Sequence, residues 1–298
     1  MRRVLLGLFV LSSMIAGCKK SPLPGTDGLD LATSTASAPA PEAKGYTDHV
    51  VAYSGTRGLV VDDKVLSGPA TANMGFDAKV KRSGPNDYFL VPLEAELKAT
   101  HGAVALVALE GATPFRTAAE ILYTLGQTGY ATFDLLVQSR SGERRILPLS
   151  SPKLGGPSCL ALDPDGVARL AAEMKAAFDG SPPPPAAPRV PLAARPALCL
   201  GFVVSPAGIT VSSGGDKLDA TCLAFAPEGP KAPTFAAAGG KVPMADVTKC
   251  AAALKARFPA AATGQVVVSG ARETPWRDVV GLLDAAVALG DPVLGVSD

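Results

Sequence analysis

Residues 103–135 read AVALVALEGATPFRTAAEILYTLGQTGYATFDL, and residues 264–296 read GQVVVSGARETPWRDVVGLLDAAVALGDPVLGV. The two stretches align without a gap. Each opens with an apolar run that is short enough for a buried strand, and each then carries a Thr-Pro-aromatic-Arg tetrad, at residues 113–116 and 274–277. The chain therefore contains an internal repeat.

The tetrad predicts the start of a helix in each copy. Thr113 and Thr274 are suitable N-cap residues because a Thr side chain can accept a hydrogen bond from an unpaired backbone N–H, and the proline that follows has no N–H to leave unpaired. Behind the tetrad, apolar residues recur at i, i+3, i+4 and i+7, starting from Phe115 in one copy and Trp276 in the other. This spacing favours a core position for both aromatic rings over a binding patch.

A short apolar strand follows each predicted helix, at residues 133–137 and 293–296, so that each copy has the strand-helix-strand pattern of a βαβ unit. Hairpins are expected at residues 49–66, 132–149 and 198–211. We therefore expect an α+β fold with two tandem α/β two-layer domains, each a small mixed sheet with two helices on one face, on a flexible lipidated N-terminal tether.

Changes of composition set the expected boundaries. The segments are, in chain order, a lipoprotein signal peptide (1–17), a disordered tether (18–45), a first domain (46–150), a partial repeat made of a CLAL loop and a helix (151–180), a proline-rich linker (181–196) and a second domain (197–298). The tether is expected to be disordered because Ser, Thr, Pro, Ala and Gly dominate it and leave few apolar side chains to bury.

The N-terminus has the pattern of a bacterial lipoprotein signal. Arg2 and Arg3 precede an apolar run of roughly thirteen residues, which is shorter than the ~20 residues of a membrane-spanning helix. The Ile-Ala-Gly-Cys tetrapeptide ending at Cys18 resembles the lipobox, in which the cysteine is acylated and becomes the first residue of the mature protein. We expect a lipid anchor of palmitate-type acyl chains at Cys18. Lys19 behind it favours the outer over the inner membrane by the sorting rule of enteric bacteria.

The repeated hairpin, helix, strand, helix, strand pattern resembles the periplasmic domain of the ExbD/TolR biopolymer-transport family. The resemblance covers most of residues 46–137 and 197–298 and is a folding pattern more than a chemical signature. It implies contacts with proteins or peptidoglycan. The family also carries a membrane-spanning helix with a proton-responsive Asp, which this chain lacks in its apolar N-terminal run, so a proton-driven role is not expected.

Four cysteines remain after lipidation: Cys159, Cys199, Cys222 and Cys250. In an oxidising periplasm they allow two disulfides with three connectivities, between which the sequence does not choose. Their spacing matches no zinc motif, and no His lies near any of them in the sequence. We expect structural cystines and no metal or other cofactor.

Arg116 and Arg277 occupy the first turn of each predicted helix, where the helix dipole disfavours a cation. One interpretation is a weak anion or partner contact, such as a peptidoglycan carboxylate, at the helix N-terminus. The other is a salt bridge to a local acid such as Glu110 or Glu273, or simple exposure.

The expected function is that of a non-enzymatic envelope lipoprotein, a periplasm-facing binding or scaffolding module whose partners are TonB/Tol-type proteins or peptidoglycan. Nucleic acid is not expected because the net charge is +1 and the basic residues are scattered. Two alternatives stay open. One is a periplasmic thiol-dependent enzyme, which would require a reactive Cys. The other is a general envelope-stability or adhesion lipoprotein of unknown activity.

Overall fold

The structure is a computed structural model in which the described residues are 23–41, 49–71, 74–98, 104–130, 132–150, 172, 175–176, 178–180, 191–195, 198–214, 216–227, 232–259 and 265–295. The predicted signal peptide, the lipidation site Cys18 and the possible disulfide partner Cys159 lie outside this range. So do most of the predicted partial repeat and of the proline-rich linker. We call residues 49–150 the first half and residues 198–295 the second half.

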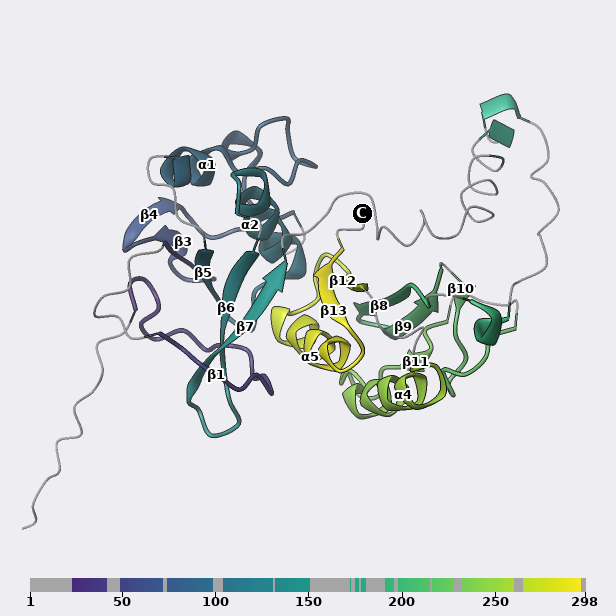
Figure 1. Cartoon of the computed structure of the whole chain (residues 1–298). Helices are drawn as coiled ribbons and strands as arrows, with labels where there is room; N and C mark the ends of the chain where they lie inside the picture. The colour runs from purple at the N-terminus through teal and green to yellow at the C-terminus, as the bar shows by residue number, and fades with distance from the viewer. Residues whose placement is uncertain are drawn as a thin grey trace, which may run out of the picture.

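One mixed sheet runs through both halves (Figure 1), in the order β10-β9-β8-β12-β13-β7-β6-β5-β2-β3-β4, with β1 added to β7 and β11 added to β9. Its strands are β1 (Ala38–Pro39), β2 (Val50–Ser54), β3 (Gly58–Val61), β4 (Lys64–Ser67), β5 (Val104–Leu109), β6 (Thr132–Gln138), β7 (Arg144–Ser150), β8 (Leu200–Ser205), β9 (Gly208–Ser213), β10 (Asp216–Lys217), β11 (Phe235–Ala236), β12 (Gln265–Gly270) and β13 (Asp291–Leu294). The helices are α1 (Val91–Lys98), α2 (Phe115–Gln127), α4 (Met244–Arg257) and α5 (Trp276–Val287), with 3-10 turns at Ala78–Val80 and Leu192–Ala194.

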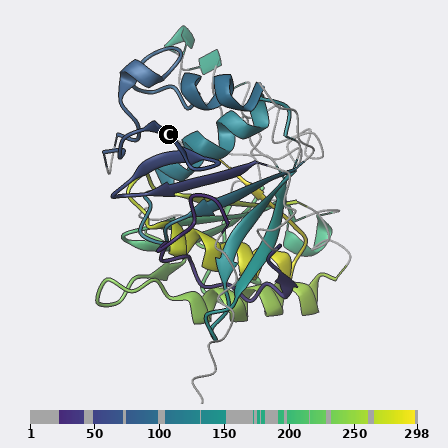
Figure 2. The same cartoon turned by 90° about the vertical axis from the view of Figure 1, so that its left-hand side faces the viewer.

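The predicted α+β class is confirmed, and both copies of the repeat fold as expected. The units β5-α2-β6 and β12-α5-β13 each pair their two strands in parallel around one helix. Figure 2 shows the helices of the first half above the strands nearest the viewer and those of the second half below them. The sheet continues from one half to the other through β13 and β7, which among the described residues share one registered pair, Val293 with Ser150. The structure thus does not separate the two predicted domains, and their boundaries stay a prediction.

One large apolar core contains the helices of both halves. Phe115 is 3% exposed and Trp276 is 1% exposed, as the helical spacing predicts. Leu93 and Leu97 of α1 and Cys250 of α4 belong to the same cluster. The helices are amphipathic, and the face that carries these residues is held by burial of apolar surface, at about 25 cal/mol per Å².

The two helix starts are joined by backbone hydrogen bonds. Equivalent residues of the two copies are 161 residues apart (264 minus 103). The hydrogen bonds are reciprocal, so that equivalent amides donate to carbonyls of the opposite copy. Phe115 N donates to Thr274 O (2.8 Å), and its counterpart Trp276 N donates to Thr113 O (2.7 Å). One residue further, the amides of the two arginines donate to the carbonyls of the opposite copy, Arg116 N to Arg272 O (3.0 Å) and Arg277 N to Gly111 O (2.9 Å).

This reciprocal junction corrects the predicted caps. Helix α2 begins after Pro114 and helix α5 after Pro275, and no side chain of the described residues caps either helix. Among the same residues, the buried Oγ1 of Thr113 has no hydrogen-bond partner, whereas that of Thr274 donates to Val204 O (3.3 Å). The free amides of a helix start must find acceptors, and here carbonyls of the other copy take the place of the threonine oxygens.

The predicted tether is wrong for residues 23–41, which form an ordered strap across the sheet face opposite α1 and α2. Leu23 and Leu31 are buried in a second apolar cluster that contains one face of β2, β3, β5 and β6. β1 pairs with β7, and Ser34 N donates to Gln138 O (2.9 Å). Small and polar residues dominate the strap, but its leucines supply enough apolar surface to fix it.

The second half has no such strap among its described residues, and its sequence gives a reason. The strap covers Val50, Ala52 and Val60 of the first half. The strand registers match these three residues with Gly201, Val203 and Thr210 of the second half, in that order. Gly and Thr replace two valines, while Val replaces an alanine, so this face offers somewhat less apolar surface to bury and covering it stabilises the fold less.

Candidate functional site

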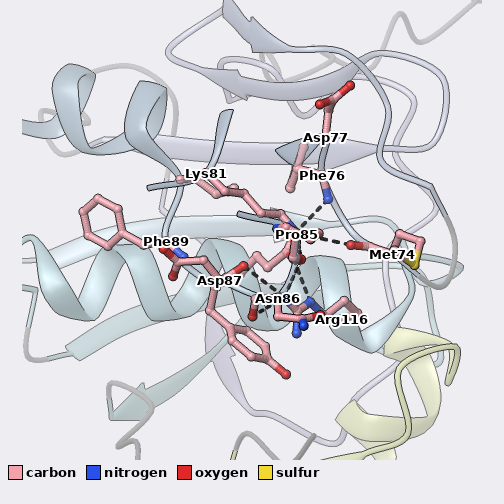
Figure 3. A network of polar contacts seen from close by, with 12 residues as sticks. Met74, Phe76, Asp77, Lys81, Pro85, Asn86, Asp87, Phe89 and Arg116 are labelled. Carbon is pink, nitrogen blue, oxygen red and sulfur yellow. Dashed lines mark hydrogen bonds and ion pairs between the residues drawn. The ribbon is translucent and has the colours of Figure 1, made fainter. Parts of the chain in front are cut away.

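Three charged side chains are buried together, Arg116 and Glu120 on α2 and Lys81 from a loop beside it. Figure 3 labels Lys81 and Arg116 within this network. The side chains of Lys81 and Glu120 are fully buried, and that of Arg116 is 1% exposed. Lys81 Nζ lies 2.6 Å from Glu120 Oε1, and Arg116 Nε lies 2.7 Å from the same oxygen. Arg116 and Glu120 are four residues apart on α2, a spacing that places both on one face of a helix.

The loop between β4 and α1, described at residues 68–71 and 74–90, supplies further partners. Lys81 Nζ donates to Met74 O (3.2 Å) and Pro85 O (2.9 Å). Phe76 N donates to the other oxygen of the Glu120 carboxylate (2.9 Å). These groups come mostly from the backbone of the loop, so the network fixes the course of the loop over the helix.

Arg116 binds the same loop from the helix side. Its Nη2 donates to Asn86 O and Asp87 O, both at 2.9 Å. Its Cζ lies 3.6 Å from the centre of the Tyr88 ring, a cation–π arrangement. The planar guanidinium can bond two carbonyls and stack on a ring at once, which an ammonium group cannot do.

The charges of Lys81, Arg116 and Glu120 interact strongly because all three groups meet at one carboxylate oxygen. Two cations share one carboxylate, and the carbonyl dipoles of the loop offset the remaining positive charge. Burial raises the pKa of Glu120, while the hydrogen bonds from Lys81, Phe76 and Arg116 act in the opposite direction. All three charged side chains are withdrawn from solvent, and they bond to one another and to the loop backbone.

The second copy of the repeat lacks this network. At the 161-residue offset, Glu120 corresponds to Gly281 and Arg116 corresponds to Arg277. A side chain at Gly281 would meet Met244 of α4, so that methionine fills the space beside the helix. Arg277 is exposed.

A disulfide fixes the corresponding loop of the second half. Cys222 lies in the connection between β10 and α4, of which residues 218–227 and 232–243 are described and which contains β11, and it is bonded to Cys250 on α4. Both cysteines are buried, which indicates a structural cystine and not a reactive thiol. With this bond fixed, the only second disulfide among the four cysteines is Cys159–Cys199. This pair stays a prediction, because Cys159 lies outside the described residues; Cys199 is half-buried.

The two predicted anion-contact residues have different surroundings. Arg116 is 2% exposed and bonded to Glu120 and the loop, so it is not a surface contact, and its acid is neither Glu110 nor Glu273. Arg277 does lie at the surface, where a partner contact stays a prediction. The pKa of its neighbour Asp278 is raised by burial and lowered in part by the Arg277 charge.

Sequence reasoning had not singled out Lys81 or Glu120. The i, i+4 spacing of Arg116 and Glu120 on a helix with an otherwise apolar face was the available signal. Lys81 comes from a loop with no periodic pattern, so only the tertiary structure reveals its place.

Two further features of the described part of the chain bear on function. None of its helices combines the length and the hydropathy needed to cross a membrane. Nor does it bring three or more His, Cys, Asp or Glu side chains together in a way that could hold a metal ion. Comparisons with protein-family models, curated proteins and solved structures find no match.

Proposed function

We propose that the chain is a lipid-anchored protein of the bacterial envelope, facing the periplasm from the outer membrane, and that it binds or scaffolds other envelope components without catalysing a reaction. The observation that carries this proposal is the buried Cys222–Cys250 disulfide. Disulfides of this kind persist in oxidising compartments and are rare in the cytosol. This compartment is the one to which the lipobox at Cys18 would direct the chain.

The non-enzymatic part of the proposal is supported by how the two halves use their reactive groups. Lys81, Arg116 and Glu120 bond to one another and to a loop backbone, and Cys222 is bonded to Cys250. In both halves these groups fix a long loop over a helix. Rigid loops on a packed scaffold are suited to recognition, because little conformational entropy is lost when they bind.

The partner class follows from the family resemblance of the sequence and is proposed on that basis alone. The repeated βαβ units agree with an ExbD/TolR-like module. TonB/Tol-type envelope proteins and peptidoglycan are therefore the proposed partners.

The anchor is tested by fractionating a Gram-negative host that expresses the full chain or the Cys18→Ser variant. The wild type is expected in the membrane fraction, with a mature N-terminal peptide that begins at residue 18 and carries the mass of its acyl chains. The variant is expected to lack this mass. A wild-type chain that keeps an unmodified N-terminus would contradict the proposal.

The thiol-enzyme alternative is tested by alkylating the native chain before and after reduction. The proposal expects labelling of Cys222 and Cys250 only after reduction and unfolding, because both lie in the core. Rapid labelling of one cysteine in the native chain, at a pH well below its usual pKa, would favour the enzyme.

A further inference from the structure

The two fixed loops occupy equivalent places in the repeat. One leads from β4 to α1 and the other from β10 to α4, so each joins the end strand of the sheet in its half to the first helix of that half. Among the described residues, each loop has one large apolar side chain that is exposed, Met74 at 54% and Leu223 at 42%. One such residue is ordinary on a protein surface, but its recurrence in both equivalent loops indicates a shared use.

Met74 lies in a tight turn that is bound to the ion network. Thr71 N donates to Gly75 O and Gly75 N donates to Thr71 O, both at 2.9 Å. The amide of Met74 donates to Thr71 O (3.1 Å). Its carbonyl accepts from Lys81 Nζ (3.2 Å), a contact drawn in Figure 3. The backbone of Met74 is therefore fixed while its side chain is exposed.

Leu223 lies in a second hydrogen-bonded turn, which is bound to the disulfide. Asp219 N donates to Ala224 O and Cys222 N donates to Asp219 O, both at 3.0 Å. The neighbouring Cys222 has a φ of 60° and is bonded to Cys250. A residue other than glycine keeps a positive φ only where its surroundings impose it, so the turn that carries Leu223 is firmly held.

From these two turns we infer that Met74 and Leu223 are apolar anchors that insert into pockets on a protein partner. The inference rests on the proposed function and narrows its partner class from protein or peptidoglycan to protein. An aliphatic side chain gains binding free energy by burial in an apolar pocket, which a protein surface can provide, whereas the sugars and carboxylates of peptidoglycan mainly offer hydrogen bonds and charge. Because both turns are already fixed, little backbone entropy is lost on binding.

The two anchors are separate contact points. Strands β4 and β10 are the two ends of the sheet, and Figure 1 shows β4 with α1 on one side of the molecule and β10 with α4 on the other. Each anchor can therefore contribute to binding on its own, and a variant should change both of them to remove the contact.

The test compares polar variants of similar shape in the full acylated chain. The anchor variant is Met74→Gln/Leu223→Asn. The matched control is Val65→Thr/Val287→Thr, because these valines are 62% and 50% exposed and lie outside both loops. Each chain is cross-linked in living cells of a Gram-negative host and purified, and half of each sample is treated with a muramidase, which degrades peptidoglycan but leaves protein adducts. Urea midpoints from Trp276 fluorescence should equal that of the wild type, since every substituted side chain is exposed.

The wild type and the control are expected to give the same protein adducts in the same yield. The anchor variant should lose about tenfold or more of this yield, which is the factor expected when even one apolar side chain is no longer buried. Equal yields from the anchor variant and the control, or adducts that the muramidase removes, would overturn the inference and leave the proposed function in place. No adduct to the acylated wild type would overturn the proposed binding function as well, so the two failures are distinguishable.

Discussion

Replacing each of the two repeat-related arginines by leucine separates a buried role from an exposed one at equivalent positions. In Arg116→Leu, Asn86 O and Asp87 O lose a charged donor, Glu120 loses one of two cations, and the Tyr88 ring loses its stacked guanidinium. Breaking a buried ion pair typically costs about 3–5 kcal/mol, because the groups left behind stay desolvated. We expect Arg116→Leu to lower the unfolding free energy by an amount in this range.

The control, Arg277→Leu, changes the same residue type in the same helix turn but at an exposed site. Surface substitutions mostly stay within about 0.5 kcal/mol. Removing the cation relieves a small unfavourable helix-dipole interaction but also removes the charge that lowers the pKa of Asp278, and these two effects oppose each other. This variant is therefore expected to be about as stable as the wild type.

The assay is urea unfolding followed by fluorescence. Trp276 is the only tryptophan of the chain and is 1% exposed, so its emission reports loss of the core at the junction of the two halves. If the slope of unfolding free energy against urea concentration is unchanged, the urea midpoint of Arg116→Leu should fall clearly, while the midpoint of Arg277→Leu should equal that of the wild type. If the two variants unfolded at the same urea concentration, the buried network would not stabilise the fold as we reason.

Three other predictions concern the loops and the strap. Cys222→Ser removes a disulfide with a sequence separation of 28 and should lower the unfolding free energy by about 3–4 kcal/mol, measured by urea unfolding under non-reducing conditions. A urea midpoint equal to that of the wild type would contradict the structural role of the disulfide. Gly75→Ala and Gly84→Ala both place alanine at a positive φ, which costs about 1–2 kcal/mol of stability in each variant. Only the new Cβ of Gly75→Ala overlaps the Glu120 carboxylate, so calorimetry should show this variant to be about 2 kcal/mol less stable than Gly84→Ala. Equal losses of stability in the two variants would argue against the tight contact between the loop and Glu120. Asp284→Ala removes two hydrogen bonds to the strap and should speed amide exchange at residues 33–36 while leaving β5 protected; unchanged exchange there would show that Asp284 does not hold the strap.

The parts of the fold that depend on local pattern were predictable. Apolar spacing placed Phe115 and Trp276 in the core, and the repeat predicted the two βαβ units, because periodicity reflects which side chains a helix or strand buries. The helix caps were not predictable in the same way. The sequence of one copy cannot show that the carbonyls of the other lie beside it and accept its amides.

The strap and the ion network were missed for related reasons. Composition made residues 18–45 resemble a tether, yet Leu23 and Leu31 find a matching apolar face on the sheet. Lys81 lies 35 residues before Arg116 (116 minus 81), so their meeting at Glu120 depends on the path of a loop. Long-range contacts of isolated residues leave no periodic trace in a sequence.

The central claim is that the anchored chain presents a binding surface to other envelope components. It is tested most directly by chemical cross-linking in living cells that express the full chain, followed by purification and mass spectrometry, with Cys18→Ser as the control. The account predicts a TonB/Tol-type protein or peptidoglycan fragments bound to the wild type and strongly reduced with the variant. Recovery of the chain alone from both strains, with the wild type acylated and in the membrane, would contradict it.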